Sequence, residues 1–364
     1  MLIKQIINEV YDVSKARIDH PEDLVFTQGS AGAKLALDIL QKATQPNSEM
    51  SFKPDGKPAI MWGRDSGGFA MGDKYMKPLP HSVEELANIL SSRKGGGRED
   101  LVKMYADMWP AFEDSVPGIN GYLFGDLVYS STPPVQNGKY VFKPNTVTYT
   151  VDADSELGQK IGNSRVGIVV HSYFPADSRV GKHVENPDSI PGVKTAGDLL
   201  IIPDSINKPE QVRVPGMSKI SSAINSNATA IDQLLDPVAL TEKKMKAFPG
   251  LLVKYINARV RQRSFDNLAK GFVDWIDANA SGAMSEKIKN HIQENLTGFN
   301  AAMQIFSMIT QAKNSIINQF DSVSGGIQAA TGDDPGHEGY LVHTGRGPIK
   351  LVDRFKFSAA NFGA

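Results

Sequence analysis

The feature that most constrains the fold is a change in hydrophobic periodicity that occurs twice along the 364-residue chain. Between about 49 and 202, short apolar runs of strand type are separated by glycine. Between about 217 and 330, apolar residues such as Ile220 and Ile224 recur at helical spacing, and strand-type sequence returns at 339–352. This order predicts an α+β fold in which a helical domain is inserted into a strand-rich one.

The same pattern sets the expected domain boundaries. We expect residues 1–210 and 333–364 to form the discontinuous strand-rich domain, and residues 211–332 to form the helical domain. Within the first part, residues 1–45 have helical spacing. A Ser-x-x-Glu capping box at residues 82–85 predicts the start of another helix.

Composition excludes several classes of protein. The chain has no cysteine, so it can hold neither a disulfide framework nor a thiolate metal site. It has no run of about 18 apolar residues, the length that a transmembrane helix needs, and its first residues lack a secretory cleavage site. We therefore expect a cytoplasmic protein with no membrane partner. The formal net charge of −1 means that any nucleic-acid binding must depend on local basic clusters.

The segment Phe52-Lys53-Pro54-Asp55-Gly56 has residue types that suit an amine nucleophile. Lys53 comes at the end of a strand-type run, and a lysine that attacks phosphorus must first lose its proton, which burial or nearby positive charge favours. Gly56 would let the backbone approach a nucleotide closely because it has no side chain. Taken alone, however, Lys-x-Asp-Gly more often marks a surface turn.

Four further segments give this motif its context. They follow in the order Phe124-Gly125-Asp126-Leu127, Arg165 to His171, Glu338-Gly339-Tyr340-Leu341-Val342 and Ile349-Lys350-Leu351. In that order the five segments resemble the motifs of the covalent nucleotidyltransferase superfamily, which contains ATP-dependent DNA ligases, RNA ligases and mRNA capping enzymes. The resemblance covers roughly 49–175 and 336–356. It implies a ligase-type nucleotidyltransferase fold, with antiparallel sheets of ATP-grasp type and flanking helices, beside the helical insert.

The resemblance also implies roles for individual residues in a reaction with ATP. Lys53 would attack the α-phosphate and hold AMP as a phosphoramidate. Asp55 would orient the lysine and, together with Glu338, bind Mg²⁺ or Mn²⁺. Asp126 would contact the ribose, and Lys350 would contact the phosphates. Such a set fits phosphoryl transfer, which needs positioning and charge neutralisation above all.

Further contacts follow from the same resemblance. Arg64 occupies the position at which the family places an arginine that reaches the ribose or the substrate phosphate. An aromatic residue, Tyr173 or Phe174, would stack on adenine. Lys74, which ends the segment Gly72-Asp73-Lys74, resembles an RNA-ligase lysine that contacts phosphate.

Three positions depart from the family pattern. Asp126 stands where glutamate is usual, which shortens the side chain by one methylene. Val352 stands where the last motif often has a second lysine, and Arg354 or Lys356 is the candidate replacement. Pro58 stands where many DNA ligases have an arginine. These departures affect individual phosphate contacts and leave the assignment of the nucleophile in place.

The substrate stays open between RNA and DNA. Only 14 residues follow Lys350, so we expect no C-terminal oligonucleotide-binding barrel of the kind that DNA ligases and capping enzymes carry. This expectation, together with Pro58 and Lys74, favours an ATP-dependent RNA ligase, with the sealing of nicked DNA duplexes as the alternative. In a third interpretation, the chain keeps the fold as a non-catalytic nucleotide-binding or structural protein.

The helical insert contributes one further candidate surface. Arg259, Arg261 and Arg263 would contact the phosphates of a nucleic acid. At a spacing of two, these arginines point in different directions around a helix. A purely structural insert is therefore an equal alternative.

Overall fold

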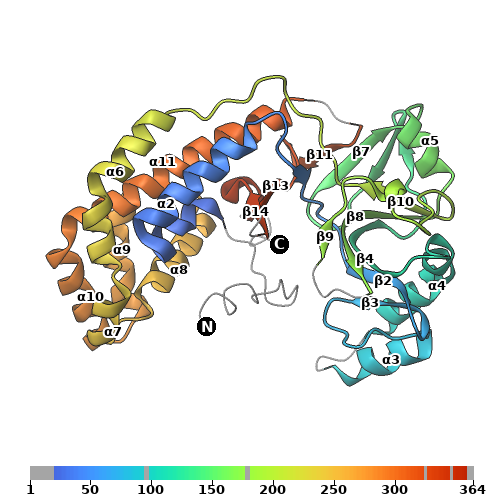
Figure 1. The fold of residues 1–364 in the computed structure, drawn as a ribbon, viewed down its shortest axis with the longest axis horizontal. Helices are drawn as coiled ribbons and strands as arrows, with labels where there is room; N and C mark the ends of the chain where they lie inside the picture. The colour runs from blue at the N-terminus through green and yellow to red at the C-terminus, as the bar shows by residue number, and fades with distance from the viewer. Residues whose placement is uncertain (1–19, 94–97, 177–180, 324–325, 345–346, 359–364) are drawn as a thin grey trace. The chain divides into compact units, whose positions relative to one another are not determined.

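The computed structural model describes residues 20–93, 98–176, 181–323, 326–344 and 347–358. It confirms the α+β class and divides the chain into two compact units, each with its own core (Figure 1). The helix expected near the start of the chain falls partly on residues outside this description. None of the described helices is long and apolar enough to cross a membrane.

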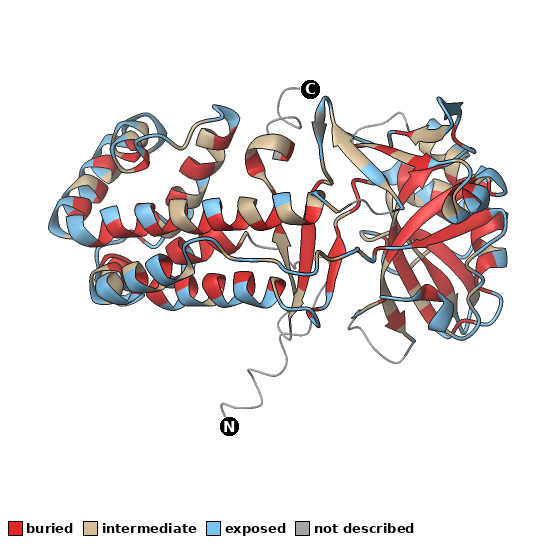
Figure 2. Ribbon diagram, turned by 90° about the horizontal axis from the view of Figure 1, so that it is seen from above, coloured by how far each residue is buried: buried red, intermediate tan, exposed pale blue. Residues whose placement is uncertain are grey.

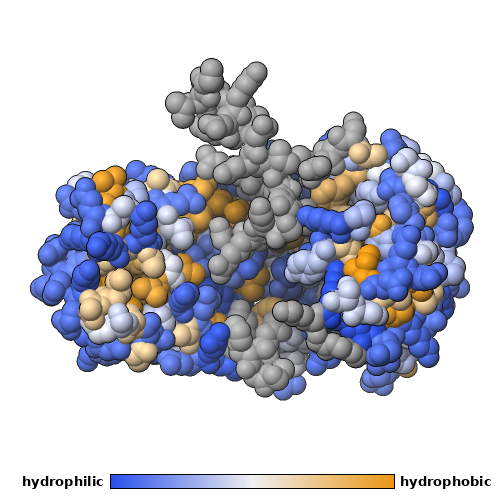
Figure 3. Space-filling view, turned by 90° about the horizontal axis from the view of Figure 1, so that it is seen from below, coloured by the Kyte–Doolittle hydropathy of each residue, from blue (hydrophilic) through white to orange (hydrophobic). Residues whose placement is uncertain are grey.

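The two units are built from interleaved parts of the sequence. The sheet unit contains the described residues of 51–207 and 324–338. The helical unit contains those of 18–50, 208–323 and 339–364. On the face shown in Figure 3, hydrophilic residues cover most of the visible surface of each unit, and hydrophobic residues show in groups among them, as expected when each unit buries its own core.

A six-stranded sheet forms the centre of the sheet unit. Its strands lie in the order β10-β8-β4-β2-β3, and β9 pairs with β8. The pairing of β10 with β8 is parallel and the other pairings are antiparallel. The strands are β2 (Ala59–Asp65), β3 (Gly68–Asp73), β4 (Gly121–Tyr129), β8 (Val166–Pro175), β9 (Lys182–His183) and β10 (Leu199–Pro203).

Helices pack on this sheet and complete its core. The Trp62 indole on β2 meets the Phe112 ring of α4 edge to face, with the ring centroids 5.1 Å apart, and the strands are buried along most of their length (Figure 2). Helix α3 confirms the predicted capping box, because the Ser82 side chain accepts a hydrogen bond from the Glu85 N–H. The helices of this unit are α3 (Val83–Ser92), α4 (Glu99–Ser115), α5 (Glu156–Gly162) and η2 (Pro187–Ser189).

A second sheet in the same unit has five short strands in the order β12-β11-β7-β6-β5. All of its pairings are antiparallel. The strands are β5 (Val135–Gln136), β6 (Lys139–Phe142), β7 (Thr148–Asp152), β11 (Gln328–Thr331) and β12 (Asp334–Pro335). The connection from β6 to β7 supplies backbone groups to the candidate site described below.

The helical unit contains the helices predicted from the spacing of apolar residues between 217 and 330. Buried residues recur along one side of the longest of them, α11, as at Ile305, Ile309 and Ile316. The helices are η1 (Pro21–Asp23), α2 (Leu24–Ala43), α6 (Met217–Leu234), α7 (Pro237–Glu242), α8 (Phe248–Arg261), α9 (Leu268–Asn279), α10 (Gly282–Glu294), α11 (Leu296–Asp321) and η3 (Arg354–Ser358).

The unit boundaries differ from the expected ones on both sides of the helical region. Helix α2, expected in the strand-rich domain, packs against α6 and α11. The antiparallel hairpin of β13 (Tyr340–Thr344) and β14 (Gly347–Leu351) also contacts α2 and α11. A hydrophobic pattern identifies the buried face of an element but not the neighbour that covers it, so sequence reasoning placed these segments in the wrong unit.

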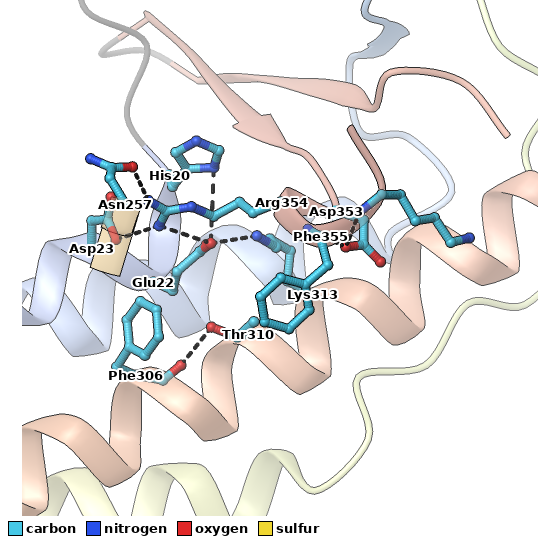
Figure 4. A network of polar contacts seen from close by, with 11 residues as sticks. His20, Glu22, Asp23, Asn257, Phe306, Thr310, Lys313, Asp353, Arg354 and Phe355 are labelled. Carbon is cyan, nitrogen blue, oxygen red and sulfur yellow. Dashed lines mark hydrogen bonds and ion pairs between the residues drawn. The ribbon is translucent and has the colours of Figure 1, made fainter. Parts of the chain in front are cut away.

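A buried ionic network ties the C-terminal segment to the helical unit (Figure 4). The Lys313 ammonium on α11 contacts Glu22, and both side chains are fully buried. Arg354 Nη1 lies 2.8 Å from Asp23 Oδ1, and Arg354 Nη2 donates to Asn257 Oδ1 at 2.6 Å. Because the Arg354 side chain is 3% exposed and held by these partners, it is not free to replace the missing phosphate-binding lysine.

Candidate functional site

Lys53 lies in the sheet unit, directly after β1 (Met50–Phe52). Its Nζ forms an ion pair with the carboxylate of Glu338, which is 285 residues later in the sequence. The Lys53 side chain is 29% exposed and that of Glu338 is 8% exposed. The structure thus brings together two residues chosen from the sequence and leaves the amine accessible from solvent.

The residue before Glu338 holds it in place. The His337 imidazole packs on the rings of Phe52 and Tyr149, with centroid distances of 5.0 and 6.3 Å. Burial lowers the pKa of His337 to about 4, so its ring is uncharged at neutral pH and packs as an aromatic group. Since Phe52 precedes Lys53 in the chain, a single ring contact positions both partners of the ion pair.

Asp55 is a buried anchor for the lysine segment. Its carboxylate accepts hydrogen bonds from Asn145 Nδ2 at 2.8 Å and from the N–H groups of Thr146 and Val147 at 2.6 and 2.7 Å. Its own N–H donates to the Tyr149 hydroxyl at 2.8 Å. With three donors on a residue that is 5% exposed, Asp55 fits the expected orienting role but not the expected metal-binding role.

Gly56 brings the lysine segment against β4. A Cβ atom at this position would lie 2.6 Å from the Leu127 carbonyl oxygen and 2.7 Å from Asp126 Cβ, too close for any side chain. The next residue, Lys57, donates its N–H to the same Leu127 oxygen at 2.9 Å. The close approach that this glycine permits is therefore to a strand of the protein, where sequence reasoning expected a nucleotide.

Asp126 extends from β4 into the same group of charges. Burial raises the pKa of its carboxyl to about 7, opposed by the positive charge of Lys53 and reinforced by the negative charge of Glu338. Lys74 and Asp55 also act on it, in opposite directions. Asp126 and Lys74 thus lie within electrostatic range of the Lys53 and Glu338 pair.

His171 on β8 is the site residue that sequence reasoning passed over. Its Nε2 lies 3.8 Å from Asp126 Oδ2, and its ring meets that of Phe124 edge to face, with centroids 4.7 Å apart. Burial, helped by the charge of Lys53, lowers the pKa of His171 to about 3, so the ring is neutral. The available sequence signal for this group was the alternation of side chains along β4, which puts Phe124 and Asp126, the two residues that His171 contacts, on one face of the strand.

The two aromatic residues suggested for adenine lie at another part of β8. Tyr173 pairs with Leu123 and Phe174 pairs with Tyr122, toward the end of β4 that is away from Asp126. The Tyr173 hydroxyl donates to a backbone carbonyl at 2.6 Å. The aromatic groups next to the Asp126 carboxylate are instead those of His171 and its ring partner on β4.

Arg64 is not brought to the site. Ala59, at the start of β2, pairs with Asp126, and Arg64 is five residues further on, or about 17 Å along the strand. There its Nε donates to the Val116 carbonyl at 2.8 Å, and its Nη2 lies 3.5 Å from Glu113 Oε1. Arg64 therefore ties β2 to the end of α4, and the role expected for it is not supported.

The other candidates belong to the helical unit. Lys350 lies on β14. Lys356, the alternative replacement for the missing lysine, has its Nζ 3.5 Å from Asn318 Oδ1. The three arginines considered for nucleic acid lie at or just beyond the end of α8, at Arg259, Arg261 and Arg263.

The assembled group can hold a cation and present an amine. Its members are Lys53, Lys74, Asp55, Asp126 and Glu338. Carboxylate oxygens are the ligands that Mg²⁺ and Mn²⁺ prefer. Burial raises the pKa of the Asp126 carboxyl, and a divalent cation at that carboxylate would favour its charged form. Asp126 and Glu338 fit such a cation better than Asp55, whose oxygens are taken by protein donors.

Comparison with known proteins identifies a family for this chain. No curated protein and no solved structure matches it. The sequence matches a family of unknown function over residues 16–364. Because that match spans nearly the whole sequence, the chain belongs to the family DUF6267.

Proposed function

We propose that this protein is an ATP-dependent polynucleotide ligase that acts through AMP bound covalently to Lys53. The observation that carries the proposal is the pairing of the partly exposed Lys53 side chain with the buried Glu338, in a group of charges that also contains Asp126. The order of the five sequence motifs adds independent support.

The first step transfers AMP to the lysine. The neutral Lys53 amine attacks the α-phosphorus of ATP, an N–P bond forms, and the bond from that phosphorus to the bridging oxygen breaks. Pyrophosphate leaves with the electron pair of the broken bond, and the nitrogen loses one proton to solvent as the phosphoramidate forms. Because the amine must be unprotonated, the ion pair with Glu338 has to open before attack, and Asp55 keeps the lysine segment fixed while it does.

A divalent cation supplies charge neutralisation at the phosphates. Asp126 and Glu338 are the residues that would hold it, since their carboxylates lie in one electrostatic group. Glu338, if it held such a cation, would no longer be available to pair with the Lys53 ammonium, which would favour release of the amine. Lys74, which interacts with Asp126 across the site, would contact a phosphate.

Labelling with ATP tests the proposal. The full chain, incubated with α-labelled ATP and Mg²⁺, should retain label after denaturation. Lys53→Arg keeps the positive charge beside Glu338 but cannot lose its proton, so it should retain none. Lys57→Ala, four residues away and exposed, is the matched control and should label normally. If the wild-type chain takes no label from ATP, GTP or NAD, the proposal is wrong.

A sealing assay then addresses the substrate. RNA ends are the preferred substrate and nicked DNA duplexes the alternative. If the chain takes label from ATP and joins RNA ends, it is an RNA ligase. Joining of nicked DNA alone would overturn the preference for RNA, and labelling with no joining of either would limit the activity to the first step.

A further inference from the structure

One segment of the helical unit carries positive charge only. Residues 243–263 contain seven lysines and arginines and no aspartate or glutamate. The segment covers the turn before α8, the whole of α8 and the turn after it. In a chain whose formal net charge is −1, such a concentration of one sign on a single element requires an explanation.

Two of the seven cationic side chains have interaction partners within the helical unit. Lys243 Nζ lies 2.6 Å from Glu294 Oε2. Arg259 donates to Gln262 at 2.8 Å and to the Asp266 carbonyl at 2.9 Å, so it shapes the turn that follows α8. Arg259, one of the residues chosen from the sequence, therefore serves local structure and is not a candidate for binding phosphate.

Other cations of the segment face solvent. We call Lys246, Lys254, Arg261 and Arg263, all exposed, the basic strip. Among the residues that the structure describes, Lys246, Lys254 and Arg263 form no ion pair. Leaving these three charges unpaired costs little in water, because all three side chains are exposed.

The geometry of α8 aligns part of this strip. Lys254 and Arg261 are seven residues apart, almost two full turns, so they lie on the same face about 10 Å apart. The opposite face packs inward through residues such as Leu252 and Ile256. About 10 Å corresponds to three nucleotides along one strand of a helical nucleic acid.

The helical unit also has a groove between α9, α10 and α11, with a volume of about 670 Å³. Phe265, one of its lining residues, comes two residues after Arg263 in the sequence. The floor of the groove is apolar, with Leu268 and Met303 among the buried residues. The polar lining has no acidic residue, and most of it is amides and amines, including Asn267, Lys270, Gln293, Asn300 and Gln304.

We infer that the helical unit binds a single strand of polynucleotide, with phosphates on the basic strip and one unpaired base in the adjoining groove. Lys246, Lys254 and Arg263, which form no ion pair among the described residues, suit a polyanion. An apolar floor suits the face of a base, and side-chain amides suit its hydrogen-bonding edge. The identification of the strand as a ligase substrate rests on the proposed function, whereas the binding site itself does not.

Binding of a fluorescent single-stranded RNA to the full chain tests the inference. The triple variant Lys246→Ala/Lys254→Ala/Arg263→Ala should bind roughly tenfold more weakly at moderate salt. It should also lower the slope of log affinity against log salt by about 2, since each phosphate contact on a single strand contributes about 0.7. Asn300→Ala/Gln304→Ala in the groove should weaken binding without changing that slope.

A matched variant removes the same charge elsewhere on the unit. Lys34→Ala/Lys219→Ala/Lys287→Ala replaces three exposed lysines on other helices and should leave affinity within about twofold, because only the strip contacts phosphates. Equal weakening by both triple variants would mean diffuse attraction and would overturn the inference. Circular dichroism and thermal melting verify that each variant is folded.

The outcomes separate this inference from the proposed function. If the chain labels with ATP but the strip variant binds RNA as the wild type does, the inference fails and the ligase proposal stands. If the chain binds RNA through the strip but never labels, the ligase proposal fails and the strip stands as a nucleic-acid site. The strip variant should still label at the wild-type rate, since Lys53 belongs to the other unit.

Discussion

Replacing Asp55 should destabilise the sheet unit strongly. Its carboxylate accepts three hydrogen bonds while the residue is 5% exposed, and two of them come from the backbone N–H groups of Thr146 and Val147. A hydrogen bond to a charged group contributes about 1.5–3 kcal/mol, but bonds that share one acceptor group are not additive. We therefore expect Asp55→Ala to lower the free energy of unfolding by about 3–5 kcal/mol.

That loss converts into a measurable melting shift. For a domain of 150–250 residues, about 1 kcal/mol corresponds to a shift of roughly 2–4 °C. Asp55→Ala should thus lower the melting temperature by about 10 °C. Asp55→Asn is the matched variant, because its amide oxygen can still accept from the Thr146 and Val147 N–H groups. Asn145 can turn its own amide to meet the new NH₂ group, so only the charge is lost, at a cost of about 1–2 kcal/mol.

Differential scanning calorimetry of the full chain distinguishes these values. The order of melting temperatures should be wild type, then Asp55→Asn, then Asp55→Ala. A melting temperature for Asp55→Ala within about 2 °C of wild type would show that the carboxylate is not the anchor of the lysine segment. As a second readout, labelling of Lys53 below both melting transitions should fall further in the alanine variant than in the asparagine variant.

Three other predictions concern charge. Burial raises the pKa of Asp23 to about 6, so the folded chain keeps a proton that the unfolded chain has lost between about pH 4 and 6, and stability should fall as pH rises through that window. Asp23→Asn should remove this fall in urea midpoints, and an unchanged pH profile would contradict the assignment. Glu22→Gln and Lys313→Met should each lower the free energy of unfolding by about 3–5 kcal/mol, because each removes one partner of a fully buried ion pair. The double variant should cost clearly less than their sum, and simple additivity would argue against the buried pair. Glu338→Gln should stop Mg²⁺-dependent labelling of Lys53 at any Mg²⁺ concentration, and labelling at the wild-type rate would remove Glu338 from the cation site.

The interior of the candidate site shows how far sequence reasoning reached. Lys53, Asp126 and Glu338 were selected from motifs that are far apart in the chain, and they lie in one electrostatic group. The ordered set of motifs was enough to select these three residues, because lysine and carboxylate residue types by themselves indicate the chemistry that a site can carry out. His171 ended one of the quoted motifs but was given no role, and His337 was not selected, because a histidine has no assignable role until its neighbours in the fold are known.

The residues whose expected roles failed have a common physical reason. Asp55 was expected to bind metal, Gly56 to approach a nucleotide and Arg64 to reach the substrate, and each instead contacts another part of the protein. Arg354 is likewise buried in an ionic network of the helical unit. The sequence shows that a side chain is polar, or that a glycine has none. Which group then forms its hydrogen bond or close contact depends on packing between distant parts of the chain.

The sequence by itself determined the types of the elements, because hydrophobic period is a local property that fixes which face of a helix or strand is buried. It determined the α+β class, the capped start of α3 at Ser82 and the all-basic segment around α8. Only the tertiary structure decided that α2 and the last hairpin join the helical unit. It alone also decided which cations of that segment remain exposed, because pairing depends on residues that are distant in the chain and adjacent only after folding.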